Sequence, residues 1–163
     1  MPVSILIDKI ANSIVEVRSN KSFDTEALPF ARAEALKIHK KDGWKFNWKS
    51  ESKDQDRQLF KLVIHGADDI QGLVSIEVME NYIEMHLIEN APANFGHEKA
   101  YAGCAGNLVA FACKISFDLG FDGFVSFRAK TELFDHYEQT LGAEKIFKDR
   151  MQIATDSGQK TRK

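Results

Sequence analysis

The chain has 163 residues, of which 44% are hydrophobic and 28% are charged, which is ordinary for one globular domain with a substantial core. Its formal net charge of −2 gives no global reason to expect binding to nucleic acid or to an anionic membrane surface. We expect a single domain over residues 1–155, followed by a disordered basic tail over residues 156–163.

The first ten residues lack the long apolar run of a signal peptide, and no other stretch is long and apolar enough to cross a membrane. The two cysteines, Cys104 and Cys113, would lie about 13 Å apart on one helix, which is too far for a disulfide bond. Neither cysteine has a partner at a metal-ligand spacing. These features favour a cytoplasmic protein with reduced thiols and no metal ion.

The first third of the chain predicts a strand and then a helix. Residues 13–18 alternate in polarity as a half-buried strand does. Asp24 is suited to cap a helix, and apolar residues recur after it at helical spacing. These apolar residues are Leu28, Ala31, Ala35, Leu36 and Ile38. We expect the helix to end among the lysines of residues 37–41, where positive charge is favourable.

Residues 44–49 place an aromatic side chain at every second position, with lysines among the residues between them. One interpretation is a half-buried strand whose aromatic face covers the core. A second is a surface on which Trp44 and Trp48 stack the bases of single-stranded nucleic acid while the lysines meet phosphates. A third is an aromatic lining for the pocket of an acceptor substrate. We favour the first, because the chain as a whole is slightly acidic.

Three strands are predicted next, over residues 59–64, 72–78 and 82–89, and the short turns between them imply antiparallel pairing. Side chains of the last strand should alternate between two faces. One face would carry Ile83, Met85 and Leu87, and the other would carry Tyr82, Glu84, His86 and Ile88.

In a sheet covered on both sides, Glu84 and His86 would be half-buried polar groups that converge on one surface. A general base for an amine nucleophile could sit there. Glu89, at the end of the same strand, is a third candidate for this role. The alternative for each residue is that it pairs with a neighbouring strand or with water.

A run of small residues follows, from Tyr101 to Asn107, and it leads into an apolar helical stretch that ends at Gly120. The apolar positions of this helix are Leu108, Phe111, Ala112, Ile115 and Leu119. The first N–H groups of a helix have no internal partner and the helix dipole favours an anion, so this turn predicts a phosphate site. A strand over residues 124–127 comes next, and the strand–helix–strand order implies a local parallel crossover. The last predicted element is a helix that holds Leu133, Phe134, Tyr137 and Leu141.

This succession resembles the GNAT superfamily of N-acetyltransferases. The family signature is Arg/Gln-x-x-Gly-x-Gly/Ala after a strand and at the start of a helix, followed by a strand and by a helix with Tyr-x-x-x-Gly-Phe. Here Tyr101 stands at the Arg/Gln position, Cys104 at the first glycine position and Gly106 at the second. Residues 137–143 are similar to the tyrosine motif, with one extra residue and with Ala143 in place of Phe. The resemblance covers about half of the chain.

The resemblance implies an α/β (α+β) fold, with a mixed, mostly antiparallel sheet flanked by helices and an acyl-CoA site at the glycine turn. It implies acetyl-CoA as the cosubstrate and an unidentified amine as the acceptor, in a monomer or a homodimer. Tyr137 is implied as the acid that protonates the departing thiolate, and Glu84 or His86 would be the base. The residues implied in binding acetyl-CoA are Ile88, Glu89, Asn90, Tyr101, Gly103, Cys104, Ala105, Gly106, Asn107 and Lys130.

Two other functions remain open. Tyr101, Cys104 and Lys130 depart from the family pattern, which allows an acyl-CoA-binding module of the same fold without transfer activity. The aromatic and lysine residues of the 44–48 stretch allow a nucleic-acid interaction protein. A covalent role for the Cys104 thiol is disfavoured, because no His or Asp is placed in the sequence to serve it. The first half of the chain carries no signature of an acceptor.

Overall fold

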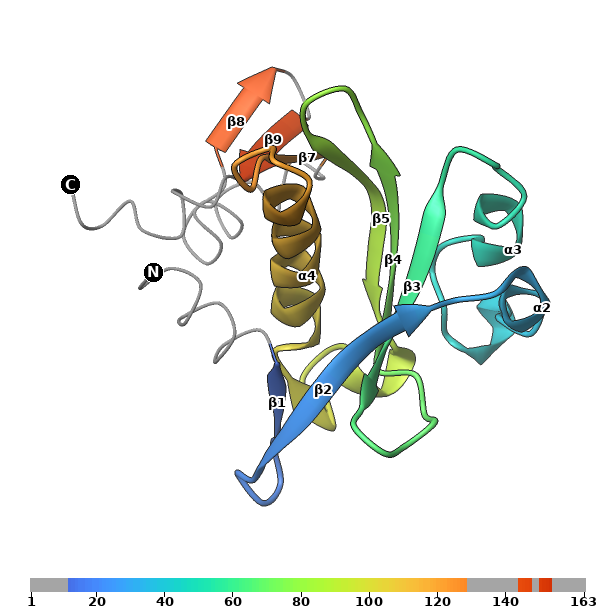
Figure 1. Ribbon diagram of the computed structural model, residues 1–163. Coiled ribbons are helices and arrows are strands. Elements are labelled where there is room, and N and C mark those ends of the chain that lie inside the picture. Colours follow the sequence, from blue (N-terminus) through green and yellow to red (C-terminus); the bar gives the residue numbers. More distant parts are fainter. Residues whose placement is uncertain (1–11, 129–143, 148–149, 154–163) are drawn as a thin grey trace.

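The computed structural model describes residues 12–128, 144–147 and 150–153. Its strands form a nine-stranded sheet in the order β6-β1-β2-β3-β4-β5-β7-β9-β8 (Figure 1). In chain order they are β1 (Ser13–Glu16), β2 (Ser22–Pro29), β3 (Gln58–Ile64), β4 (Gly72–Val78), β5 (Ile83–Asn90), β6 (Tyr101–Ala102), β7 (Val125–Arg128), β8 (Glu144–Phe147) and β9 (Arg150–Ile153). The helical elements are α2 (Arg32–Ala35), α3 (Trp48–Glu51), α4 (Cys104–Asp118) and the 3-10 turns η1 (Lys40–Asp42) and η2 (Pro92–Asn94).

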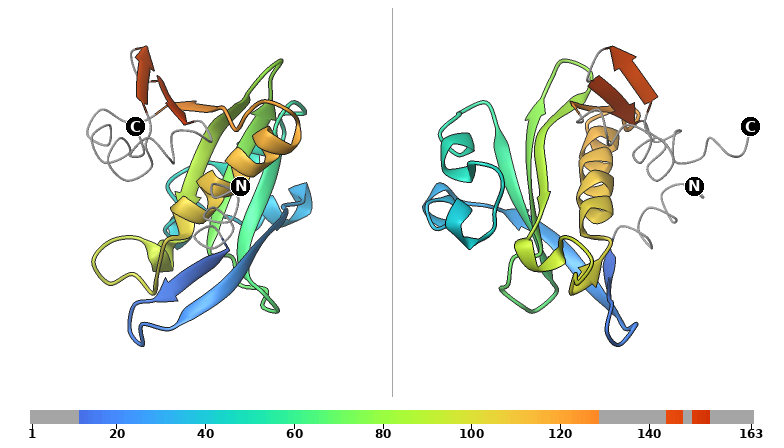
Figure 2. Two further views of the ribbon diagram at one scale, coloured as in Figure 1. Left: turned by 60° about the vertical axis from the view of Figure 1, so that its left-hand side comes forward. Right: turned by 180° about the vertical axis from the view of Figure 1, so that it is seen from behind.

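The sheet is the middle layer of three. Paired strands run antiparallel, except that β5 and β7 are parallel, and α4 lies in the connection between those two. The long helix α4 covers one face, whereas the short helices α2 and α3 lie over the other (Figures 1 and 2). The predicted mixed, mostly antiparallel sheet flanked by helices is therefore confirmed, and so is the parallel crossover.

Two apolar clusters hold the layers together. The first lies between α4 and the sheet and includes Ile14, Leu62, Val74, Ile76, Ile83, Met85, Leu108, Ala112 and Val125. The second lies between the sheet and the segment that contains α2 and α3, and its buried members are Phe30, Ala35, Trp44, Trp48, Leu59, Leu73 and Ala91. Burial of this apolar surface is the main favourable term for packing each helix layer on the sheet.

The predicted helix after Asp24 is wrong, because residues 22–29 form strand β2. This strand pairs with β1 through Ser22 to Asp24 and with β3 through Thr25 to Pro29. Backbone pairing on both flanks outweighs the weak helical periodicity, since propensity alone is a minor term. The helix is reduced to α2, in which only Ala35 is buried.

The aromatic stretch is not a strand, which corrects that part of the prediction. Trp48 instead begins α3, where the Asn47 side chain accepts a hydrogen bond from the N–H of Ser50 at 3.0 Å and caps the helix. The expectation that the tryptophans face the core is confirmed, because Trp44 is 8% and Trp48 is 0% exposed. Neither indole is free to stack on a base or to line an open pocket.

Glu89 of β5 holds this segment in place. Its carboxylate accepts hydrogen bonds from the N–H groups of Lys45 at 2.6 Å and Phe46 at 3.3 Å, and from Nε1 of Trp48 at 2.8 Å. Hydrogen bonds to a charged acceptor are stronger than neutral ones, so this carboxylate fixes the segment before α3 against the end of β5.

The remaining expectations concern membranes, metals and the end of the chain. In the part of the chain that the structure describes, no helix is long and apolar enough to span a membrane. Within the same part, no three His, Cys, Asp or Glu side chains gather as they would around a metal ion. The predicted helix around Tyr137 and the predicted tail lie outside the described residues.

Replacement of Trp48 by Ala should lower the free energy of unfolding by about 3–5 kcal/mol, because a fully buried indole is lost. Trp48→Phe keeps most of the apolar area but removes one donor to Glu89, so it should cost less, about 1–3 kcal/mol. Urea unfolding measures both variants, and Leu36→Ala is the control because Leu36 is 49% exposed. A Trp48→Ala variant as stable as the Leu36→Ala variant would contradict the core assignment.

Candidate functional site

Strand β5 continues past the end of its pairing with β7. The two strands pair only between Ile83–Met85 and Val125–Phe127, whereas β5 runs on to Asn90. On its other side, β5 pairs with β4 as far as Asn90. One edge of the His86–Asn90 backbone therefore has no partner strand among the described residues. Such an edge can pair with an extended ligand that carries amide groups.

A β-bulge marks the point where the pairing with β7 stops. Ser75 of β4 lies opposite Leu87 and Ile76 lies opposite Met85, so His86 is one extra residue in β5. The bulge changes which side chains share a face. Met85 and Ile88 both pack toward α4, whereas Leu87 packs with the cluster under α3. The prediction that Ile88 shares a face with Glu84 and His86 is therefore wrong.

Polar side chains collect on the face under α2 and α3, beside the bulge. Nε2 of His86 lies 2.8 Å from Oε1 of Glu77, and the His86 side chain is 21% exposed. Glu84 lies opposite Glu77 on one side and Ser126 of β7 on the other, and it is only 4% exposed. The structure thus brings together the two predicted bases. It adds Glu77, which sequence reasoning missed because Glu77 belongs to the preceding strand.

Glu51 and Arg57 form the border of this polar group. Nη1 of Arg57 donates to both carboxylate oxygens of Glu51 at 2.8 Å, and the hydroxyl of Ser75 also donates to Glu51. The pKa of Arg57 is raised: burial opposes this shift, while the hydrogen bond to Glu51 and the nearby charges of Glu51, Asp54 and Glu77 outweigh it. The guanidinium therefore lies close enough to Glu77 to interact with it electrostatically.

The helix begins earlier than the glycine run suggested. Tyr101 and Ala102 form β6, which pairs with β1, and α4 starts at Cys104 after Gly103. Gly103 has a φ of +99°, which glycine adopts without strain. The first bond of the helix joins the N–H of Asn107 to the carbonyl of Gly103 at 3.0 Å.

The three N–H groups before that bond, on Cys104, Ala105 and Gly106, have no partner inside the helix. An added Cβ at Gly106 would meet no atom within 4 Å, so the space beside the first turn is open. Free N–H groups and open space are what a phosphate needs at a helix N-terminus.

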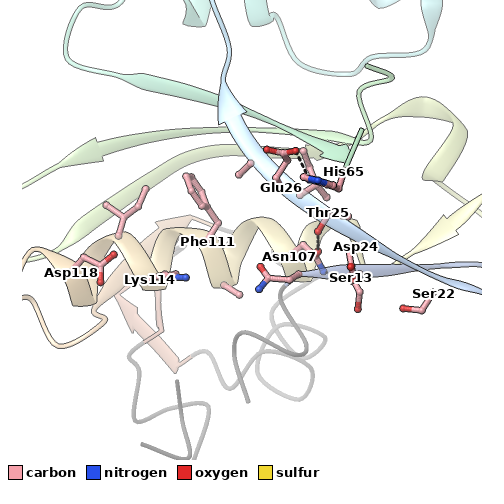
Figure 3. A pocket seen from close by; sticks show the side chains of 15 residues that line it. Ser13, Ser22, Asp24, Thr25, Glu26, His65, Asn107, Phe111, Lys114 and Asp118 are labelled. Atoms are coloured by element: carbon pink, nitrogen blue, oxygen red, sulfur yellow. Dashed lines mark hydrogen bonds and ion pairs between the residues drawn. The ribbon is translucent and has the colours of Figure 1, made fainter. Parts of the chain in front are cut away.

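Asn107 fastens the start of α4 to the sheet. Its Oδ1 accepts a hydrogen bond from Thr25 Oγ1 at 2.6 Å (Figure 3). Its Nδ2 donates to the carbonyls of Ser13 and Gly103 at 2.9 Å each. Its side chain is therefore used inside the fold. The predicted role of Asn107 in binding acetyl-CoA stays a prediction, and its side chain holds the helix start against β1 and β2.

The other residues predicted to bind acetyl-CoA or to act as the acid lie in different parts of the chain. The N–H of Tyr101 donates to Asn94 Oδ1 at 3.1 Å, and its ring packs edge-on against Phe23. Oδ1 of Asn90 is buried and has no hydrogen-bond partner in the described part of the chain. Lys130 and Tyr137 lie outside the described residues.

A separate cavity of about 840 Å³ lies between α4 and strands β1 to β3 (Figure 3). Asn107, Phe111 and Lys114 line it from α4, and the pair of Glu26 and His65, 2.8 Å apart, borders it from β2 and the end of β3. It includes neither the free edge of β5 nor Gly103 to Gly106. The cavity is therefore distinct from the site beside the bulge.

The two thiols are unsuited to covalent catalysis. Burial raises the pKa of Cys104 to about 11 and that of Cys113 to about 12. The weak reading of Cys104 as a nucleophile thus loses its physical basis, because the thiolate is the reactive form and is scarce at neutral pH.

Comparisons with known proteins place the fold. No family model matches the sequence, and no curated protein is similar to it in sequence. Among solved structures, a putative acetyltransferase of the GNAT family from Desulfovibrio desulfuricans has a TM-score of 0.60 at 12% identity, covering 80% of this chain and 99% of that one. The ribosomal-protein-S18-alanine N-acetyltransferase of Escherichia coli has a TM-score of 0.59 at 10% identity, covering 80% and 94%.

A third structure, a PaiA N-acetyltransferase from Thermoplasma acidophilum in complex with coenzyme A, has a TM-score of 0.53 at 10% identity, covering 80% of this chain and 99% of that one. The chain therefore has the GNAT fold, as its resemblance implied. At these identities the likeness concerns the fold and leaves the reaction to be argued from the site.

Two glycines of the turn should respond in opposite ways to replacement by Ala. Gly103→Ala forces a Cβ into a left-handed conformation and should cost about 1–2 kcal/mol of stability. Gly106→Ala adds a better helix former where nothing obstructs it and should gain up to about 1 kcal/mol. Urea unfolding of the two variants checks this. Equal effects at both positions would place the start of the helix elsewhere.

Both cysteines should resist Ellman's reagent in the native protein. With a pKa of about 11, fewer than about one Cys104 side chain in a thousand is a thiolate at pH 7.5. Labelling should be slow at pH 7.5 and should reach both thiols quickly once urea unfolds the chain. Rapid labelling of Cys104 in the folded state would restore it as a candidate nucleophile.

Proposed function

We propose that this protein transfers an acetyl group from acetyl-CoA to an amine. The observation that carries the proposal is the edge of β5 from His86 to Asn90, which has no partner strand among the described residues. The connection after this edge passes through η2 and β6 and then enters the first turn of α4. The GNAT fold adds the expectation that these two features serve one ligand.

The described residues fit the parts of acetyl-CoA. The N–H groups of Cys104, Ala105 and Gly106 precede the first backbone bond of the helix, so they can bind its pyrophosphate. Backbone groups of Ile88 to Asn90 can pair with the amides of the pantetheine arm, because a free strand edge accepts an extended partner. Oδ1 of Asn90, on the same strand, is buried and accepts no hydrogen bond from any described residue.

The position of the helix start also improves the match to the family signature. Because α4 begins at Cys104, we align Gly103 with the first glycine of the motif and Ala105 with the Gly/Ala position. The spacing Gly-x-Ala then agrees with the family, and Cys104 is no longer a departure. Ala100 takes the Arg/Gln position in place of Tyr101 and remains different from the family.

The reaction needs a neutral amine as the nucleophile, stabilisation of the negative charge on the carbonyl oxygen, and a proton for the thiolate that leaves. A free N–H on the β5 edge can donate to the carbonyl oxygen as negative charge develops there. Tyr137 remains the family-matched acid, and Lys130 remains a proposed cofactor contact. Burial of Trp44 and Trp48 argues against the nucleic-acid function and against an acceptor pocket lined by these two rings.

Replacement of Gly106 by Glu tests the cofactor site. The new side chain would bring a carboxylate to the phosphate position and should weaken acetyl-CoA binding at least tenfold, about 1.4 kcal/mol. Isothermal titration calorimetry measures the affinity, and circular dichroism checks that the variant is folded. Phe117→Glu is the matched control, since it adds one negative charge at a position of the same helix that is 49% exposed.

A folded Gly106→Glu variant that binds acetyl-CoA normally would move the site elsewhere. Release of free CoA, measured across amines, polyamines and peptides, identifies the acceptor. Binding of acetyl-CoA without turnover on any of these would support the acyl-CoA-binding module in place of the transferase.

A further inference from the structure

His86 is the ionisable residue of β5 that lies at the bulge. It is the extra residue of the bulge, directly after the last residue of β5 that pairs with β7. If acetyl-CoA lies along the edge of β5 that begins at His86, the imidazole lies at the point where β5 and β7 stop pairing. Its side chain is 21% exposed, so a proton acceptor there can be reached from solvent.

Glu77 determines which nitrogen of His86 can accept a proton. Oε1 of Glu77 lies 2.8 Å from Nε2, so in the neutral imidazole the Nε2–H donates to the carboxylate. The lone pair is then on Nδ1, and no hydrogen bond to Nδ1 is found among the described residues. A carboxylate placed in this way holds the imidazole in one tautomer and one orientation.

The other carboxylates near this place are already engaged. Glu84 is 4% exposed and has an interaction partner, which leaves it poorly placed to meet an incoming amine. Glu51 is held by Arg57 and Ser75, and Glu89 is held by three donors from the aromatic segment. The charged groups described on this face include Glu77 from β4, Glu84 and Glu89 from β5, and the Glu51–Arg57 pair from α3 and the turn after it. Oδ2 of Asp54 lies 3.5 Å from Nε of Arg57, and Lys61 of β3 is paired with Glu34 of α2.

We infer that His86 is the general base that receives the proton of the acceptor amine, and that Glu77 is the residue that positions it. This inference rests on the proposed function. As the amine nitrogen bonds to the carbonyl carbon of the thioester, Nδ1 of His86 takes one proton from that nitrogen. The carbon–sulfur bond breaks, its electron pair leaves with the sulfur, and the thiolate takes a proton from an acid or from water. His86 then returns its proton to solvent, and the products are the N-acetyl amine and CoA.

The test of His86 uses turnover on the best acceptor together with binding of acetyl-CoA. His86→Ala should lower kcat by about 10²–10⁴-fold, the usual range for a positioned base, and leave the affinity for acetyl-CoA within about twofold. Added imidazole should restore part of the lost turnover, because a free base can enter the space left by the side chain. A structural role for His86 would not respond to imidazole.

The test of Glu77 separates positioning from folding. Glu77→Ala should lower kcat by about tenfold or more without raising KM for acetyl-CoA, whereas Glu77→Gln keeps an oxygen that accepts the Nε2–H and should retain more activity. Nuclear magnetic resonance of ¹⁵N-labelled histidine should show a change at His86 in Glu77→Ala, and this readout needs no turnover. The matched controls are Glu26→Gln and His65→Gln, because that pair has the same 2.8 Å contact away from the bulge.

Failure of the acetyltransferase function and failure of the assignment of His86 give different results. If the wild type binds no acetyl-CoA, the proposed function fails, and the assignment of the base fails with it. If the wild type transfers acetyl groups and His86→Ala keeps wild-type kcat, only the assignment of His86 is overturned. A loss in His86→Ala that imidazole does not reverse, or equal losses in the Glu26→Gln control, would likewise overturn it.

Discussion

Strand β5 contains one residue more than the part of β4 that it pairs with, and the arrangement of the candidate site depends on this bulge. Before the bulge, β5 is held on both sides by β4 and β7. After it, the pairing with β7 has stopped, and one edge of the backbone as far as Asn90 has no partner strand in the part of the chain that the structure describes. A bulge locally increases the twist of a strand, so it is a physical means of separating two strands that begin side by side. The same residue, His86, places an ionisable group at the point of separation.

Other segments of the fold pack against both faces of β5 after the bulge. On one face, Glu89 binds the backbone and the indole of the segment before α3. Lys45 of that segment also lies over the ring of Phe95, 3.4 Å from its centre, in the loop that leads from β5 toward α4. The segment that contains α2 and α3 is therefore attached to the strand and to the loop that follow the bulge. On the other face, Leu108 of α4 packs close to Gly72, which pairs with Asn90, so the first half of α4 lies close to the same strand.

The start of α4 depends on a few short-range features. Gly103 supplies the left-handed turn, and the Asn107 side chain ties the first helical turn to β1 and β2. The N–H groups of Cys104, Ala105 and Gly106 have no backbone partner inside the helix, and an added Cβ at Gly106 would meet no atom within 4 Å. Rigid attachment of a helix start whose N–H groups are unused is what an anion site requires, because the groups need not be ordered again when the anion binds.

The sequence by itself determined the elements whose signals are local. The alternating residues of β3, β4 and β5, the spacing of apolar residues in α4 and the glycine at its end were enough to predict four elements and the crossover to β7. The order of loop, helix and strand was also enough to suggest the GNAT fold. Only the tertiary structure decided the rest, because it depends on partners far apart in the chain. Pairing with β1 and β3 made residues 22–29 a strand, and Glu89 drew Trp48 into the core at the start of a short helix. The bulge at His86 moved Ile88 to the other face and joined His86 to Glu77, since the register of two strands is a property of the pair and not of either sequence alone.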